Sequence, residues 1–268
     1  MTDAVEPGRI EMMLESRVAV VTGATRGLGE GITRAFAAEG ATVAMFGRDL
    51  GRLRQHEQEL AGAGSTAVPH QVDVSSSAAV AAAVDATLNR FGRIDILVNN
   101  AGIAPSVPLV EMTDRDRDEV FAININGSFN CARAVLPSMI DAAYGKIINL
   151  SSVTGPLVSG KGLTAYAASK GAISGFTRTL ALEVAEHGIN VNAILPGSFD
   201  TPMMRNIARL RSDDEDGYLR ALGSGMPMGR LGSSEEVGDL AVFLASERSR
   251  YITGAEIVID GGNVICEH

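Results

Sequence analysis

Short apolar runs alternate with longer amphipathic segments along most of the chain. Seven runs have the length and β-branched content of strands, and they cover residues 17–23, 41–47, 65–74, 94–102, 145–152, 189–197 and 255–262. Between them, apolar residues recur at helical spacing in residues 29–39, 50–61, 78–91, 115–142, 165–187 and 235–246. The pattern predicts repeated strand–helix–strand units.

The predicted strands are apolar on both faces, which indicates a parallel sheet covered by helices on each side. The 268 residues suffice for one large domain, and no linker or internal repeat divides them. We therefore predict a single α/β domain over residues 1–268 with a Rossmann-type, doubly wound parallel sheet and helices on both faces. Two segments lie outside the pattern. Residues 1–14 are expected to form a flexible N-terminal extension, and residues 198–232, rich in Gly, Met and charge, to form a lid over the substrate.

The composition narrows the function classes. The net charge of −9, with scattered basic residues, argues against a nucleic-acid-binding protein. No apolar run reaches the roughly 18 residues of a membrane span, and the N-terminus lacks the apolar core of a secretion signal. We expect a cytoplasmic protein with Cys131 and Cys266 as reduced thiols. We expect no metal site, because no ligand spacing connects the four histidines, which are His56, His70, His187 and His268.

The first predicted strand runs into a glycine-rich turn, TGATRGLGEG, with Gly23, Gly27 and Gly29. In a doubly wound sheet this turn places a dinucleotide pyrophosphate at the N-terminus of the following helix. The alternative is a tight turn that merely tolerates glycine. A nucleoside-triphosphate loop is excluded, because no Lys-Ser or Lys-Thr follows the glycines.

The end of the second predicted strand bears on the choice of cofactor. NAD-binding folds usually carry an acidic residue here for the ribose hydroxyls, whereas this strand ends in Gly47 and Arg48. A guanidinium at Arg48, with Arg26 of the glycine turn, could bind a 2′-phosphate through charge-assisted hydrogen bonds. The sequence thus favours NADP(H) over NAD(H). Asp49 leaves NAD open, because a small backbone shift would let it serve the ribose, and Arg48 could also be an ordinary surface charge.

Tyr166 and Lys170 stand four residues apart in a predicted helix. Four tyrosines and three lysines over 268 positions give about 0.04 such pairs by chance. An alcohol gives up hydride only as its proton leaves, so a dehydrogenase needs a base at that carbon, and the same group is the acid in reduction. A phenol, with a pKa of about 10, serves at neutral pH only if a cation stabilises its phenolate, and Lys170 could supply that charge. The alternative is a solvated pair on a helix surface.

Together the motifs resemble the short-chain dehydrogenase/reductase family along nearly the whole chain. The matching stretches are TGATRGLG at the glycine turn, VDV at Asp73, NNAG at Asn99–Gly102, NING at Asn124, SS at Ser151 and Ser152, Tyr166 with Lys170, PGSFDT at Pro196–Thr201, and DGG at Asp260. The resemblance implies hydride transfer between a nicotinamide and an alcohol or carbonyl carbon, and usually a homotetramer. Within the family, SSVTG, EVGDLAVFLAS and VIDGG are similar to a group of bacterial oxidoreductases.

The resemblance also implies roles for individual residues. Tyr166 is the acid and base, Ser152 binds the substrate oxygen, and Asn124 holds a water that links Lys170 to solvent. Ser151 is the rival of Ser152, because the segment up to Tyr166 is about one residue longer than is common, and Asn126 is the rival of Asn124. The expected cofactor contacts are Gly23, Thr25, Arg26, Gly27, Leu28, Gly29, Arg48, Asp73, Val74, Asn99, Ala101, Gly102, Tyr166, Lys170, Pro196, Gly197, Phe199 and Thr201.

The sequence therefore predicts an NADP(H)-dependent oxidoreductase for a small alcohol or carbonyl substrate. Two alternatives remain: a reductase of 3-oxoacyl thioesters, for which Arg205, Arg209 and Arg211 offer basic residues, and a sensor that binds NADP(H) without turnover. In the lid, Met203, Met204, Met226 and Met228 are either an adaptable wall or ordinary core, and residues 212–217 are expected to be a solvated tip. For the homotetramer we expect a symmetric interface formed by the helix over residues 165–187, through Ala168, Ile173, Phe176, Leu180 and Leu182, together with the neighbouring helix from Arg115.

Overall fold

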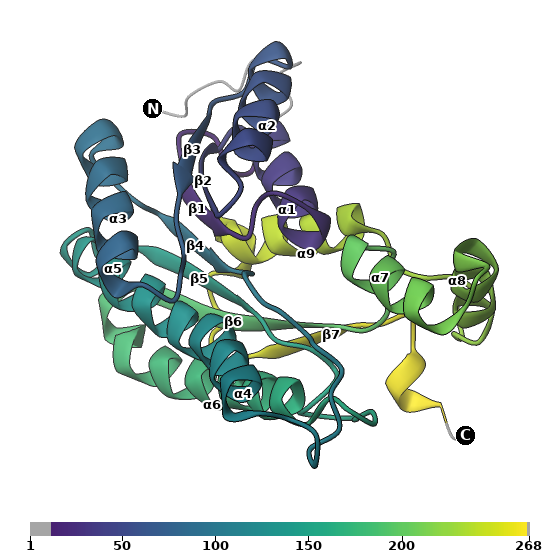
Figure 1. Ribbon diagram of the computed structural model, residues 1–268. Helices are drawn as coiled ribbons and strands as arrows, with labels where there is room; N and C mark the ends of the chain where they lie inside the picture. The colour runs from purple at the N-terminus through teal and green to yellow at the C-terminus, as the bar shows by residue number, and fades with distance from the viewer. Residues whose placement is uncertain (1–11, 267–268) are drawn as a thin grey trace.

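The computed structural model describes residues 12–266, and its centre is one parallel sheet of seven strands (Figure 1). The strands lie in the order β3-β2-β1-β4-β5-β6-β7, so the direction of winding reverses between β1 and β4. This arrangement confirms the predicted Rossmann-type sheet. The strands are β1 Val18–Thr22, β2 Thr42–Gly47, β3 Ala67–Gln71, β4 Ile96–Asn99, β5 Gly145–Leu150, β6 Ile189–Pro196 and β7 Glu256–Ile259.

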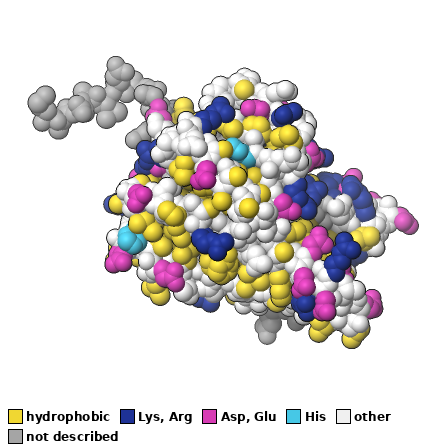
Figure 2. All heavy atoms as spheres, turned by 60° about the vertical axis from the view of Figure 1, so that its left-hand side comes forward, with side chains coloured by type: hydrophobic (Ala, Val, Ile, Leu, Met, Phe, Trp, Pro, Cys, Tyr) yellow, Lys and Arg dark blue, Asp and Glu magenta, His cyan; other side chains and the backbone are white. Residues whose placement is uncertain are grey.

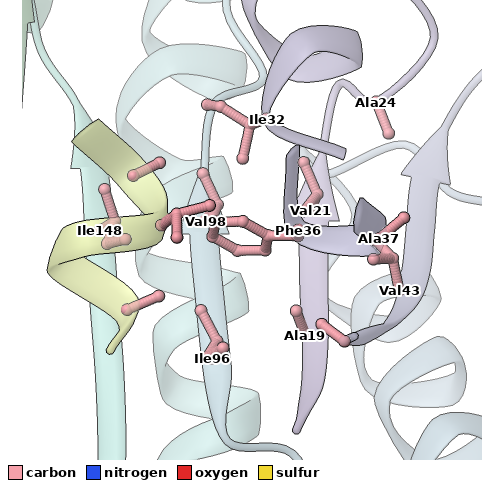
Figure 3. Packing of buried hydrophobic residues seen from close by; sticks show 14 of the residues in the cluster. Ala19, Val21, Ala24, Ile32, Phe36, Ala37, Val43, Ile96, Val98 and Ile148 are labelled. Carbon is pink, nitrogen blue, oxygen red and sulfur yellow. The ribbon is translucent and has the colours of Figure 1, made fainter. Parts of the chain in front are cut away.

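Helices cover both faces of the sheet. One hydrophobic cluster joins α1, α2 and α9 to one face, and Figure 3 shows Phe36 and Ile32 of α1 packed over Val21 and Val98. A second cluster joins α3, α5 and α6 to the other face. The helices of these layers are α1 Gly27–Ala38, α2 Leu50–Gly62, α3 Ser77–Phe91, α5 Gly127–Asp141, α6 Thr164–Val184 and α9 Ser234–Ala245. Burial on both faces explains why the strands lack apolar–polar alternation.

The segment predicted as one helix over residues 115–142 is divided in two. Helix α4 spans Asp114–Phe121 and α5 spans Gly127–Asp141, and a π-helical turn, Ala122–Asn126, connects them. Such a turn adds one residue and shifts the phase of the helix once, and a count of apolar positions over the whole segment did not resolve this shift.

The lid over residues 198–232 contains two helices that the apolar pattern did not predict, α7 Pro202–Arg211 and α8 Glu215–Ser224. Asp213, Asp214 and Asp216 are exposed, so residues 212–217 are solvated, but the second half of this segment forms the first turn of α8. Asp214 caps α8, and Glu215 binds Arg205 at 3.2 Å and Arg209 at 2.6 Å. Ion pairs therefore join these two helices alongside the buried side chains of Ala208 on α7 and Leu219 on α8, and hydrophobic periodicity does not register the charged contacts.

Most of the expected N-terminal extension, residues 1–11, lies outside the described residues. Its predicted end is wrong, because Leu14 is fully buried and its N–H donates to the Glu39 carbonyl at 3.0 Å. None of the helices between residues 12 and 266 is long and apolar enough to cross a membrane. The face in Figure 2 mixes Lys and Arg with Asp and Glu side chains.

Candidate active site

The glycine turn connects β1 to α1 and leaves no space for side chains at two positions. Gly23 has φ +67°, a conformation that favours glycine. A Cβ atom at Gly29 would lie less than 3.0 Å from the Gly23 carbonyl oxygen and the Asn100 side-chain nitrogen. Thr25 of the same turn faces Gly47 at the end of β2, where an added Cβ would lie 3.1 Å from the threonine methyl. The turn thus lies tightly against its neighbours at the switch between β1 and β4.

The N-terminus of α1 has no side-chain cap. Arg26 is its N-cap residue and makes no side-chain capping bond. Nearby helices are capped, α2 by Asp49, α3 by Ser76 and α7 by Thr201. Free N–H groups and the positive end of the helix dipole are a binding site for an anion, so the geometry fits the pyrophosphate of a dinucleotide.

The two charged side chains that follow β2, Arg48 and Asp49, have different contacts. Arg48 is exposed, and its positive charge contributes to lowering the pKa of Asp73, after the larger effect of the Ser75 hydrogen bond. Asp49 accepts a hydrogen bond from the Arg52 N–H at 3.1 Å, so its carboxylate caps α2. Both side chains are exposed, and the Asp49 carboxylate is engaged as a helix cap, which bears on the choice between NADP and NAD.

Asp73 and Val74 follow β3 and lie against α5. The Val74 carbonyl accepts a hydrogen bond from the Asn130 side chain at 2.9 Å. A Cβ atom at Gly127 would lie 2.7 Å from the Val74 side chain, so α5 approaches this loop closely. The loop is therefore held at the carboxyl edge of the sheet, on the side away from α1.

The NNAG stretch runs from the end of β4 towards the catalytic residues. The Thr22 hydroxyl accepts hydrogen bonds from the N–H groups of Asn100 at 2.9 Å and Ala101 at 3.0 Å. A Cβ atom at Gly102 would lie 3.3 Å from the Asn124 side-chain oxygen and 3.7 Å from the Lys170 nitrogen. This small residue allows the loop to pass directly beside both side chains. Asn99 itself is buried in the sheet, where its amide donates to Asn149 at 2.9 Å.

Asn124 lies in the π-helical turn and is buried. Its side-chain oxygen accepts from the Ile103 N–H at 2.9 Å, and its amide donates to the Ile103 carbonyl at 2.9 Å and to the Ser169 hydroxyl at 3.0 Å. The side chain therefore joins the loop after NNAG to α6. Its rival Asn126 is exposed.

Ser152, Tyr166 and Lys170 meet at the carboxyl edge of β5. A hydrogen bond from Ser152 lowers the pKa of Tyr166, but burial of the phenol outweighs it and raises that pKa overall. The Lys170 nitrogen donates to the Leu150 carbonyl at 2.6 Å and lies 5.7 Å from the centre of the Tyr166 ring. Burial lowers the pKa of Lys170 to about 8. The expectation that Lys170 brings the tyrosine pKa below its usual value is not met in this structure, because desolvation of the phenol dominates.

Two further serines, Ser151 and Ser169, bond to the backbone of the α6 turn that carries Tyr166 and Lys170. The sequence did not predict these contacts. The Ser151 hydroxyl donates to the Lys170 carbonyl at 2.9 Å, and the Ser169 hydroxyl donates to the Tyr166 carbonyl at 2.7 Å. These bonds hold a helix end whose N-cap residue, Leu163, provides no side-chain cap. The contact of Ser151 with the helix backbone supports Ser152 as the serine that faces substrate. The only sequence feature that could have indicated the supporting role of Ser169 is its position next to Lys170.

The segment after β6 reaches back to the glycine turn. Pro196 ends β6, and the Gly197 N–H donates to the Ile259 carbonyl at 2.9 Å. Phe199 is 5% exposed and packs on Gly232 at the other end of the lid. Thr201 caps α7, and its side chain would lie 3.6 Å from a Cβ atom at Gly27. Leu28, next to Gly27, packs against the hydrophobic core.

The lid methionines are not core residues. Met203 and Met228 are exposed, while Met204 and Met226 are partly exposed. Of the arginines, Arg205 also binds Asp200 at 2.7 Å, so it and Arg209 are neutralised by carboxylates. No group of three or more His, Cys, Asp or Glu side chains that could hold a metal ion occurs in the described part of the chain.

These features define a nicotinamide-dependent oxidoreductase with a Rossmann-type sheet. The family model described as enoyl-(acyl carrier protein) reductase matches residues 23–263, and the chain belongs to the short-chain dehydrogenase/reductase family. It is 45% identical to the oxidoreductase UcpA of Escherichia coli K12 over 95% of this chain and 97% of that protein. It is 41% identical to a 3-oxoacyl-[acyl-carrier-protein] reductase, FabG, of Thermotoga maritima over 95% of this chain and 100% of that protein. The crystal structure of levodione reductase has a TM-score of 0.90 at 32% identity, covering 95% of this chain and 100% of that one.

Proposed function

We propose that the protein is an NADP(H)-dependent oxidoreductase that interconverts a carbonyl compound and the corresponding alcohol. The observation that carries the proposal is that Ser152 lies close enough to Tyr166 to lower its pKa, with Lys170 one helical turn further, at the same sheet edge as the uncapped N-terminus of α1. Reduction and a nicotinamide cofactor are also the properties expected of the family.

In the proposed reaction each side chain has one task. The Ser152 hydroxyl donates a hydrogen bond to the substrate carbonyl oxygen and so orients the carbonyl carbon. Tyr166, protonated because burial raises its pKa, transfers its proton to that oxygen as the alcohol forms. The Lys170 ammonium stabilises the phenolate left behind. When bound, the reduced nicotinamide supplies the hydride that the carbonyl carbon accepts.

The other predicted residues divide between cofactor and lid. The α1 N-terminus with Gly23, Thr25, Arg26, Leu28 and Gly29 would hold the pyrophosphate. Asp73 and Val74 would meet the adenine, the loop from Asn99 to Gly102 the nicotinamide ribose, and Pro196, Gly197, Phe199 and Thr201 the carboxamide. The Asn124 side chain makes three hydrogen bonds to protein, and its backbone carbonyl accepts one from the Ser128 hydroxyl at 3.2 Å, so the water predicted there would have to share one of these oxygens.

We expect Arg48 to discriminate between the two nicotinamides. Replacing Arg48 by Asp should weaken NADPH binding about 10- to 100-fold, because charge-assisted hydrogen bonds to a phosphate are lost and a repulsive carboxylate is added. NADH binding should stay unchanged or improve. The measurement is a fluorescence titration of both cofactors, with Arg54→Asp, at an exposed residue of the following helix α2, as a control for surface charge. Equal effects on both cofactors would place the 2′-phosphate elsewhere.

Two alternatives are weakened by specific contacts. A 3-oxoacyl-thioester reductase would need basic residues at the entrance for an acidic carrier, and two of the three expected arginines, Arg205 and Arg209, are already paired with carboxylates, which leaves Arg211. A non-catalytic NADP(H) sensor has no need for the Ser152–Tyr166 contact. Turnover of a panel of carbonyls and alcohols with both nicotinamides tests the proposal. A protein that binds NADPH but turns over no member of the panel would favour the sensor.

We also propose that the protein is cytoplasmic and assembles into a homotetramer. Of the residues expected at the interface, Ile173 and Leu180 are buried against the core. Ala168, Phe176 and Leu182 remain accessible on α6, and the Phe176 ring lies 4.3 Å from that of Phe129, which is 50% exposed on α5. An apolar surface across two helices indicates an interface.

Replacing Leu182 by Glu should therefore divide the assembly. Leu182 is 82% exposed, so the folded subunit should tolerate the change, while a buried unpaired charge at a symmetric interface is costly and would occur at each copy. Light scattering at micromolar concentration should give a tetramer for the wild type and a smaller species for the variant. Ala61→Glu, on the exposed side of α2, is the control. A monomeric wild type would contradict the proposed assembly.

A further inference from the structure

Three segments are joined by chain connection or contact to the catalytic residues or to the glycine turn, and we call them together the entrance. Residues 153–163 connect Ser152 to the turn before Tyr166, so catalytic residues lie at both ends of this loop. Residues 103–113 are bound at Ile103 by Asn124, and the Val107 N–H donates to the Gly162 carbonyl at 2.9 Å. The third segment is α7, whose first turn lies beside the glycine turn. In Figure 1 all three lie beyond the same ends of the strands.

The entrance presents large apolar side chains to solvent. In residues 103–113, Leu109 is 65% exposed and Val110 is 94% exposed, and in residues 153–163 Leu157 is 52% exposed. Val158 and Met203 are also exposed. The Leu157 side chain stands on an ordered loop, because its N–H donates to the Val153 carbonyl at 3.1 Å and the Gly155 N–H donates to the Val158 carbonyl at 2.8 Å.

The entrance offers little charge to a substrate. The two loops carry one acidic and one basic side chain, Glu111 and Lys161, and so have no net charge. On α7 the guanidinium of Arg205 binds Asp200, Glu215 and Asp216, and that of Arg209 binds Glu215, while Arg211 at the far end of the helix is exposed. A carboxylate or phosphate on the substrate would have to compete with these ion pairs.

We propose that the substrate is an uncharged ketone, or its secondary alcohol, with an apolar ring or chain beside the reacting carbon. This inference rests on the proposed function and adds the substrate class. The carbonyl end meets Ser152 and Tyr166, while the apolar body covers Leu109, Leu157, Val158 and Met203. Exposed apolar side chains on both sides of the reacting group gain free energy when such a body removes them from water, whereas a polyhydroxylated body would lose hydrogen bonds to water there.

The test uses the full-length protein with NADPH and a series of ketones. The series is cyclohexanone and its 4-methyl, 4-ethyl and 4-propyl derivatives, compared with dihydroxyacetone, acetoacetate and acetoacetyl-coenzyme A. We expect kcat/KM to rise about fourfold for each added methylene that is buried. The polar and charged compounds should be at least tenfold poorer than 4-propylcyclohexanone.

Two variants assign the effect to the entrance. Leu157→Gln should lower kcat/KM for 4-propylcyclohexanone about tenfold, mainly through KM, and leave NADPH affinity unchanged. Tyr251→Gln, at a fully exposed aromatic residue before β7 on the opposite edge of the sheet, should change nothing. If dihydroxyacetone or a charged substrate is preferred, the inference is overturned but the proposed function stands. If no carbonyl compound is reduced while NADPH binds, the proposed function fails instead.

Discussion

Replacing Tyr166 by Phe should lower kcat for carbonyl reduction about 10²- to 10⁴-fold, the usual contribution of a positioned acid. The affinity for NADPH should stay within about twofold, because the variant loses one hydroxyl and keeps the ring that packs near Lys170. The measurement combines initial rates on any ketone that the wild type reduces with a fluorescence titration of NADPH. Near-normal turnover would place the acid elsewhere and reduce the Tyr166–Lys170 pair to a helix contact.

The matching variant Lys170→Ala should impair both steps, since it removes the charge that stabilises the phenolate and a proposed ribose contact. Wild-type reduction should also depend on pH in a specific direction. Burial lowers the pKa of Lys170 to about 8, so its ammonium is present below that pH and lost above it, while Tyr166, whose pKa is raised, stays protonated. Reduction should therefore hold steady below pH 8 and fall above it, and this decline should be absent in Lys170→Ala. A wild-type rate that stays flat to pH 10 would contradict the assignment.

A methyl group at Gly29 should abolish cofactor binding. In Gly29→Ala the new Cβ would overlap the Gly23 carbonyl and the Asn100 side chain, which are held by β1 and by bonds to Thr22, so the glycine turn must move. We expect NADPH affinity to fall by about 100-fold or more, with a loss of about 1–3 kcal/mol in the free energy of unfolding from overpacking. Titration of NADPH and urea unfolding measure the two effects.

The control is Gly62→Ala at the end of α2, where an added Cβ meets nothing within 4 Å. This variant should keep cofactor affinity and unfold at the same or slightly higher urea concentration, because alanine favours helix. If Gly29→Ala binds NADPH as well as Gly62→Ala does, the pyrophosphate does not lie on this turn.

The strands and the long helices were predictable because burial of one or both of their faces produces short apolar runs or apolar residues at helical spacing in the sequence. All seven strands and the six long helical segments occupy the predicted regions, with ends shifted by a few residues. Helices α7 and α8 escaped prediction because each has only 10 residues and buries one apolar side chain, Ala208 on α7 and Leu219 on α8. The arginine–carboxylate pairs that also join them leave no apolar period. The expected interface residues Ile173 and Leu180 were misplaced for a related reason, since spacing shows that a helix is apolar all round but not which side the core covers.

The candidate site was predictable where chemistry demands particular side chains at fixed spacing, as for Tyr166 and Lys170. Supporting contacts were not. Ser169 and Thr22 are common polar residues whose hydroxyls find partners far along the chain, such as Asn124 and Asn100. The direction of the Tyr166 pKa shift was missed because the sequence shows the neighbouring cation but not the burial of the phenol or the bond from Lys170 to Leu150.

The π-helical turn Ala122–Asn126 sets the spacing between two distant parts of the site. Asn124, in the middle of this turn, is bonded to Ile103 in the loop beside Lys170. Six positions later, Asn130 is bonded to Val74, which follows Asp73, the residue proposed to meet the adenine. Each residue of a regular helix turns the chain by about 100°, so deleting Ile125 would rotate Asn130 and Gly127 away from Val74 if Asn124 stayed in place. This short segment should therefore tolerate substitution of its exposed side chains but not a change in its length.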